Sequence, residues 1–116
     1  MVDLNGGAEL SQAFKRNQKL LNAIGDETRQ AIIITLMRFS RTPGMRVGEI
    51  TERTNLSRPA VSHHLRILKE AQIVNVHKRG TMNFYYLDSI DKLKQLKALT
   101  ELLMQCETQQ QAESGD

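Results

Sequence analysis

The sequence of 116 residues contains one cysteine, Cys106, no tryptophan and only two prolines. One thiol cannot form a disulfide within the chain, and neither a Cys-x-x-Cys pair nor a Cys/His cluster offers the ligands of a structural zinc site. A run of about 18 apolar residues is also missing, and the first ten residues lack the basic and apolar regions of a signal peptide. We therefore expect a single cytoplasmic domain.

The patterns of common catalytic sites are absent as well. No candidate nucleophile is accompanied by an evident base, no pair of carboxylates stands in a recognisable frame, and no glycine-rich loop could hold a phosphate. We therefore predict that the protein is not an enzyme.

Basic residues are present in excess, and they are concentrated in the middle of the chain. The whole chain has a formal net charge of +3. Residues 53–81 contain six basic residues and one acidic residue, a net charge of +5, whereas the rest of the chain is slightly acidic. Such a concentration favours a polyanionic partner such as duplex DNA. The residues concerned are Arg53, Arg58, Arg66, Lys69, Lys78 and Arg79, with Glu70 as the only acid.

Residues 55–72 within this stretch have the periodicity of an amphipathic helix. Ser57 is a suitable N-cap, and Pro59 falls in the first turn, where a missing N–H is tolerated. At about 100° per residue the helix has one apolar face for packing and one polar, basic face. The apolar side carries Val61, Leu65, Leu68 and Gln72, and the opposite side carries Arg58, Pro59, Ser62, Arg66 and Lys69.

Three further helices are predicted before or beside this one in the first half of the chain. A first helix runs from about residue 10 to Ile24 and stops at Gly25, and Asp26 caps a strongly apolar core helix that includes Met37 and Phe39. A short strand at 45–47 precedes a helix at 48–54. Residues 55–57 then form the turn of a helix-turn-helix.

The second half predicts a hairpin and one long helix. Two β-rich runs, 73–78 and 82–87, are joined around Gly80, which suits a hairpin turn, and Lys78 and Arg79 lie near the tip of this wing (73–87). The last helix runs from Ser89 to about residue 109. We expect residues 1–8 to be a flexible arm and residues 110–116 to be a disordered tail. The predicted fold is mainly α, with about five helices and a two-stranded antiparallel wing, and its core domain covers 9–109.

The order of these motifs resembles the ArsR/SmtB family of winged helix-turn-helix regulators. The resemblance is carried by GDETRQAIIITLM, VGEI, LSRPAVSHHLRILKEAQIV and NFYYL, and it extends in register over roughly 20–87. It implies a symmetric homodimer, held by the N-terminal and C-terminal helices, that binds a palindromic operator, usually as a repressor.

Within this scheme the N-terminal part of the recognition helix approaches base edges in the major groove of DNA. Arg58 has the reach for a guanine edge, whereas Ser57, Arg66 and Lys69 are suited to phosphates. An exposed basic side chain is as often merely solvated, and we expect His64 to be a packing residue. The predicted DNA-binding residues are Ser57, Arg58, Pro59, Ala60, Ser62, His63, Arg66, Lys69, Lys78 and Arg79.

Leucines and other apolar residues of the terminal helices form a stripe that nothing else in the chain is left to cover. We favour a second copy of the chain as the covering partner. The predicted dimer interface comprises Leu10, Phe14, Leu21, Leu93, Leu96, Leu99 and Leu103.

The effector is the least determined property. The resemblance implies cysteines in the helix before the recognition helix for soft metals, but residues 47–50 are Val-Gly-Glu-Ile. It implies an aspartate and several histidines for zinc between the C-terminal helices, and only Asp91 is present there. We therefore expect no metal, no cofactor and no familiar metal-sensing role. A small organic ligand, modification of Cys106, a protein partner or no effector remain open, as does a winged helix that serves as a protein-interaction module.

Overall fold

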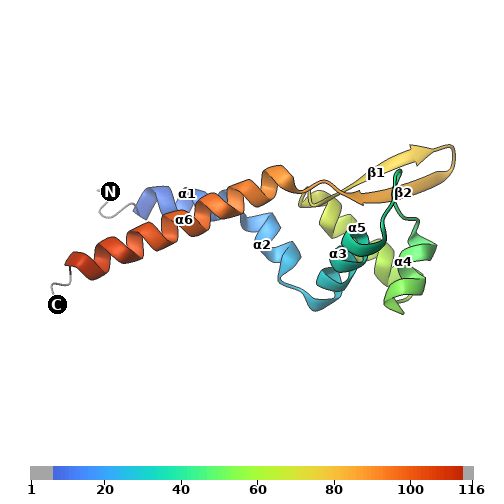
Figure 1. Cartoon of the computed structure of the whole chain (residues 1–116), viewed down its shortest axis with the longest axis horizontal. Coiled ribbons are helices and arrows are strands. Elements are labelled where there is room, and N and C mark those ends of the chain that lie inside the picture. Colours follow the sequence, from blue (N-terminus) through green and yellow to red (C-terminus); the bar gives the residue numbers. More distant parts are fainter. Residues whose placement is uncertain (1–6, 114–116) are drawn as a thin grey trace. The chain divides into compact units, whose positions relative to one another are not determined.

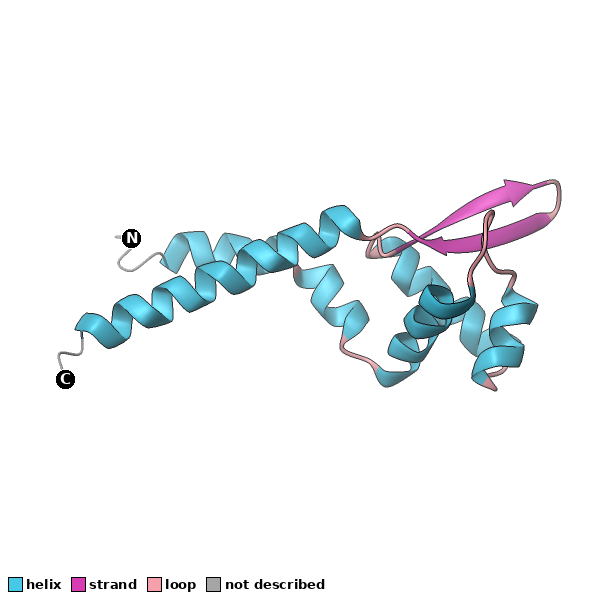
Figure 2. Cartoon of the chain, viewed as in Figure 1, coloured by secondary structure: helices cyan, strands magenta, loops and turns pink. Residues whose placement is uncertain are grey.

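A computed structural model describes residues 7–113, which divide into two compact units. One unit spans residues 19–89, and the other combines the segment before residue 19 with the segment from residue 90 onward. Figure 2 shows helices with a single hairpin, which confirms the predicted mainly α fold with a two-stranded wing. Within residues 7–113, no helix is both long enough and apolar enough to cross a membrane.

The unit of residues 19–89 contains the winged helix-turn-helix. Its elements are most of α2 (Gln18–Ile24), then α3 (Glu27–Phe39), α4 (Val47–Thr54), α5 (Arg58–Glu70), β1 (Val74–Arg79) and β2 (Met82–Leu87) (Figure 1). Helix α3 packs against α4, α5 and β2, and α5 also packs against α4 and β1. The buried apolar side chains of these elements include Ile32, Leu36, Ile50, Val61, Leu65, Leu68 and Val74.

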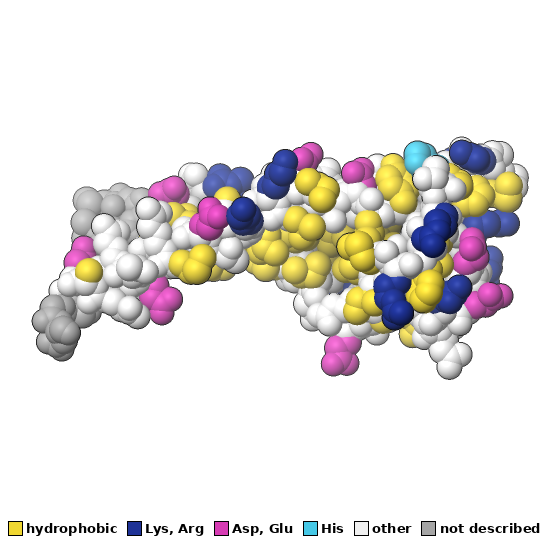
Figure 3. Space-filling model, viewed as in Figure 1, with side chains coloured by type: hydrophobic (Ala, Val, Ile, Leu, Met, Phe, Trp, Pro, Cys, Tyr) yellow, Lys and Arg dark blue, Asp and Glu magenta, His cyan; other side chains and the backbone are white. Residues whose placement is uncertain are grey.

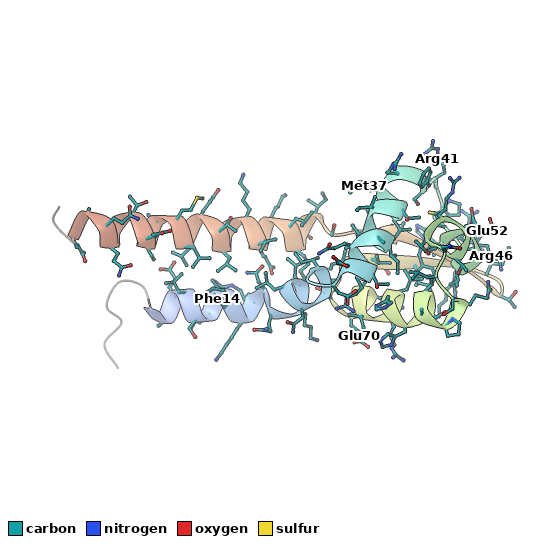
Figure 4. The ribbon with its side chains drawn as sticks, turned by 90° about the horizontal axis from the view of Figure 1, so that it is seen from below. Phe14, Met37, Arg41, Arg46, Glu52 and Glu70 are labelled. Atoms are coloured by element: carbon teal, nitrogen blue, oxygen red, sulfur yellow. The ribbon has the colours of Figure 1, made fainter. Side chains whose placement is uncertain are left out.

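Helix α3 begins as predicted, because the Asp26 side chain accepts a hydrogen bond from the Arg29 N–H at 3.0 Å. Ile32 and Leu36 are buried, as expected of a core helix, but Met37, another of its apolar residues, is exposed. The Met37 side chain is 69% exposed and lies on the outer side of the helix (Figure 4). A helix packed along one face can bury only one stripe, so its most apolar segment still leaves some apolar residues outside.

The helix-turn-helix follows the predicted boundaries closely. Asn55 ends α4 in the left-handed region, with φ of 61°, a conformation that asparagine tolerates better than most residues. Ser57 caps α5, since its side chain accepts a hydrogen bond from the Ala60 N–H at 3.2 Å. The helix ends at Glu70, two residues earlier than predicted, and Gln72 has a positive φ and is exposed instead of facing the core.

The wing is an antiparallel hairpin in which Arg79 pairs with Met82 across a two-residue turn. Gly80 occupies that turn with φ of 62°, which glycine adopts without strain. The predicted short strand at 45–47 is reduced to a single bridge between Met45 and Tyr85. Gly44 allows this bridge, because a Cβ at that position would come within 2.5 Å of the Tyr85 carbonyl oxygen.

The second unit is formed by α1 (Gly7–Arg16) and α6 (Ile90–Glu113), which pack side by side (Figure 1). The single helix predicted from residue 10 to Ile24 is therefore wrong, because Asn17 separates α1 from α2 and raises the number of helices within residues 7–113 to six. The buried Asn17 amide donates to the carbonyl oxygens of Ala13 at 2.8 Å and Gln95 at 3.3 Å. A short amide side chain that bonds the backbone in this way competes with a continuous helix.

The predicted terminal segments are only partly within the described residues. Residues 1–6 and 114–116 lie outside them. Gly7 and Ala8 belong to α1, and residues 110–113 continue α6 beyond the predicted end at residue 109.

Candidate DNA-binding surface

The outer face of α5 carries the side chains that the sequence predicted to meet DNA. Ser57, Arg58, Pro59, Ser62, His63, Arg66 and Lys69 are exposed, and only Ala60 is half-buried. Val61, Leu65 and Leu68 on the opposite face are completely buried, so the helix is fixed to its unit along that side. Figure 3 shows lysine and arginine side chains on the visible surface of the α3, α4 and wing region.

Arg58, at the first position of α5, lies against the first turn of α4. A Cβ built on Gly48 would be 3.2 Å from the Arg58 Nη1 atom, so the guanidinium rests over a position that has no side chain. The two residues border a cleft of about 440 Å³ between α4, α5 and the wing, in which Arg46 and Glu52 are also found (Figure 4). The cleft is lined by Arg46, Val47, Gly48, Glu49, Glu52, Arg58, Thr81 and Asn83.

His63 and Arg66 are joined on the exposed face of α5. The Arg66 Nη2 atom lies 3.2 Å from His63 Nδ1. Because arginine only donates, this contact is a hydrogen bond when His63 Nδ1 carries no proton and accepts. In that form the Nε2 N–H on the other edge of the ring suits an acceptor on a base or a phosphate.

The wing adds basic side chains at its tip. Lys78 and Arg79 are exposed on β1, and they pair in register with Asn83 and Met82 on β2. Thr81 and Asn83 share the cleft with Arg58, which brings the wing and the start of α5 to one surface. Tyr86 stacks on His77 with ring centroids 4.4 Å apart, so this tyrosine packs within the wing.

The rear of α5 is held by a polar contact as well as by apolar packing. His64, predicted to be a packing residue, is half-buried and its Nδ1 atom lies 3.2 Å from Arg29 Nη1, which confirms that prediction. Burial is the main cause that lowers the pKa of His64 below its usual value, and the Arg29 charge acts in the same direction. The pKa of Asp26 is also lowered, chiefly because its carboxylate accepts the Arg29 backbone N–H.

This surface has the chemistry of an anion-binding face. The basic side chains of α5 and of the wing tip favour negative charge, as does the positive end of the α5 helix dipole, and a helix of this kind fits the major groove of B-DNA. Sequence reasoning missed the cleft residues Arg46, Thr81 and Asn83, and it missed Arg29. Thr81 and Asn83 flank the glycine turn, so their proximity to the wing tip was the one available signal.

Known proteins share these features. The family model described as "Bacterial regulatory protein, arsR family" matches residues 26–76, which include the helix-turn-helix and the first half of β1. The transcriptional repressor SdpR of Bacillus subtilis is 37% identical over 70 residues, 60% of this chain and 73% of SdpR. MJ1325 of Methanocaldococcus jannaschii, an HTH-type transcriptional regulator, is 35% identical over 92 residues, which are 79% of this chain and 99% of MJ1325.

A third relative is similar in both sequence and structure. The transcriptional activator HlyU of Vibrio cholerae is 34% identical over 107 residues, 89% of this chain and 92% of HlyU. The structure of reduced HlyU superimposes with a TM-score of 0.62 at 30% identity, covering 81% of this chain and 95% of that one. The chain therefore belongs to the ArsR family of bacterial regulatory proteins, and it is a DNA-binding transcriptional regulator and not an enzyme.

Proposed function

We propose that the protein is a cytoplasmic homodimeric repressor that binds a palindromic operator through α5 and the wing. The observation that carries this proposal is the exposed polar face of α5, which is rigidly backed by three fully buried side chains, Val61, Leu65 and Leu68. In this proposal the phosphate backbone is contacted by Ser57, Arg66, Lys69, Lys78 and Arg79, and base edges are read by Arg58, Pro59, Ala60, Ser62 and His63.

Dimerisation is proposed because the unit of α1 and α6 leaves large apolar side chains uncovered. Phe14, Leu93 and Leu103 are 42%, 44% and 37% exposed, and Leu10 and Leu96 are half-buried. Leu21, the remaining predicted interface residue, is half-buried on α2 in the unit of residues 19–89. Figure 3 shows hydrophobic side chains along the visible face of α6. Leu99 leaves the predicted interface, because it is only 2% exposed in the single chain.

The last part of the proposal is that the protein represses transcription and is not controlled by a metal ion of the kinds familiar in this family. One relative is named a repressor and another an activator, and a dimer on an operator represses wherever that operator overlaps a promoter. In residues 7–113, no three histidine, cysteine, aspartate or glutamate side chains are close enough together to hold a metal ion. The cysteines that the family resemblance implies at residues 47–50 for soft metals are also absent.

The test is a selection of bound sequences from random duplex DNA with metal-free protein at ~150 mM salt, where nonspecific binding is weak. An enriched palindrome whose half-sites are centred about 10 base pairs apart supports the dimeric reading. A reporter gene that carries this site next to its promoter then shows whether the protein represses or activates, and lower expression in the presence of the protein supports repression.

Enrichment of a single half-site would contradict binding to a palindromic operator. If no sequence is enriched without an added ligand, the protein-interaction alternative is favoured.

A further inference from the structure

Arg29 connects the end of α2 to the rear of the recognition helix. Its Nε atom donates to the Ala23 carbonyl oxygen at 2.7 Å, and its Nη2 atom donates to the Asn22 carbonyl oxygen at 3.1 Å. The third corner of the same guanidinium, Nη1, lies 3.2 Å from His64 Nδ1 on α5. The carbonyl groups in the last turn of a helix have no partner within that helix, so Arg29 satisfies two of them with one rigid group.

The contact with His64 requires a neutral imidazole with its proton on Nε2. Arginine only donates, so Nδ1 must keep its lone pair and accept. Protonation of Nδ1 would remove that lone pair and set an imidazolium against a guanidinium. The contact therefore exists in one protonation state of His64 and is lost in the other.

We propose that Arg29 is a positioning residue for the recognition helix, and that proton uptake by His64 releases this link and weakens sequence-specific DNA binding. The proposal rests on the DNA-binding function given above. It assigns no DNA contact to either residue, because His64 lies on the side of α5 away from the exposed basic face.

The direction of the pH dependence follows from the groups around His64. Burial lowers its pKa most, the charges of Arg29 and of His63 lower it further, and the nearby Asp26 carboxylate opposes them. The folded protein thus favours the neutral ring. The link is complete above the ordinary pKa of 6.5 and is lost as the pH falls through the lower pKa of the folded state.

The experiment compares the full chain with Arg29→Ala, Arg29→Lys and His64→Gln at pH 7.5 and 5.5 and at constant ionic strength. Affinity is measured on the selected operator and on random duplex. Glutamine offers a neutral acceptor that does not titrate, so His64→Gln should lose less specific affinity at pH 5.5 than the unmodified chain, by on the order of tenfold. The comparison variant His77→Gln removes the imidazole of the wing, and it should flatten the pH dependence of specific binding less than His64→Gln does.

Both Arg29 variants should bind the operator more weakly than the unmodified chain at pH 7.5. Their additional loss of operator affinity between pH 7.5 and pH 5.5 should be smaller than the loss of the unmodified chain. Lysine keeps the charge but cannot reach three acceptors with one planar group. Equal pH profiles for the unmodified chain and His64→Gln, or unchanged binding by Arg29→Ala, would overturn the proposal.

A measurement without DNA separates this proposal from the operator model. NMR of the imidazole nitrogens should place the His64 proton on Nε2, and Arg29→Ala should raise the pKa of His64, because a neighbouring cation is removed. A proton on Nδ1, or the same titration with and without Arg29, would refute the link even if the chain recognised no operator. If the NMR result holds and only the selection fails, the operator model is the part that is wrong.

Discussion

At the scale of single residues, Arg58 is the side chain whose role is most sharply set by its surroundings. It stands at the first position of α5, next to Pro59, and its guanidinium lies over Gly48. An alanine at residue 48 would place a Cβ 3.2 Å from Arg58 Nη1, so the guanidinium would have to shift. The absence of a side chain at residue 48 thus helps to determine where Arg58 points.

Arg58→Ala should weaken operator binding by ~1 to 3 kcal/mol and relax the preference at one base pair in each half-site, since a bidentate contact to guanine would be lost. Competition binding on operators altered at single positions measures both effects. Arg58→Lys is the matched control, because it keeps the charge and removes the planar fork. An equal loss on operator and random duplex would reduce Arg58 to a phosphate contact.

At the scale of elements, α5 and the wing differ in how they are held. Helix α5 is anchored by buried leucines on one face and by the Arg29 contact at His64. At the tip of the wing Lys78, Arg79 and Gly80 are all exposed, so these residues lack the buried anchoring face that α5 has. An exposed basic tip is suited to the phosphate backbone or a narrow minor groove and less suited to base recognition.

Arg79→Ala should therefore lower affinity for operator and random duplex to a similar extent, and it should reduce the slope of log affinity against log salt by ~1. Titrations at several salt concentrations measure that slope. Lys97→Ala, which removes one exposed positive charge from α6, serves as the control and should leave the slope unchanged. Unaltered affinity of Arg79→Ala for every duplex would remove the wing from the DNA-binding surface.

At the scale of the whole molecule, the two units differ in how well one chain completes them. The unit of residues 19–89 has a core with several fully buried side chains. The unit of α1 and α6 buries Ala13 and Leu99 but leaves Phe14, Leu93 and Leu103 substantially exposed. Apolar surface on this scale in one small unit is better covered by a second chain than by water.

Leu103→Asp should yield monomers that bind the operator poorly, because a carboxylate would be buried without a partner at the interface. Sedimentation gives the mass, and the melting temperature of the unmodified chain should rise with protein concentration while that of the variant should not. Met37→Asp places the same charge on an exposed apolar residue of α3 and should leave the dimer intact. A dimer that survives Leu103→Asp and Leu96→Asp would move the interface elsewhere.

Most elements could be predicted because their signals are local. The cap at Asp26, the cap at Ser57 and the glycine turn at Gly80 each act within a few residues, and the structure has all three. The buried face of α5 followed from helical periodicity alone. The break at Asn17 was missed because its amide bonds the Gln95 carbonyl oxygen, 78 residues away in the chain.

The class of fold, the polar face of the recognition helix and the concentration of basic charge follow from local patterns in the chain, because periodicity, caps and composition are properties of neighbouring residues. Tertiary packing sets which apolar residues are internal, as Leu99 is, and which are exposed, as Met37 is. It also decided that Arg58 lies over Gly48 and that Arg29 meets His64, 35 residues further along. Such pairings depend on how helices pack, and no local pattern encodes them.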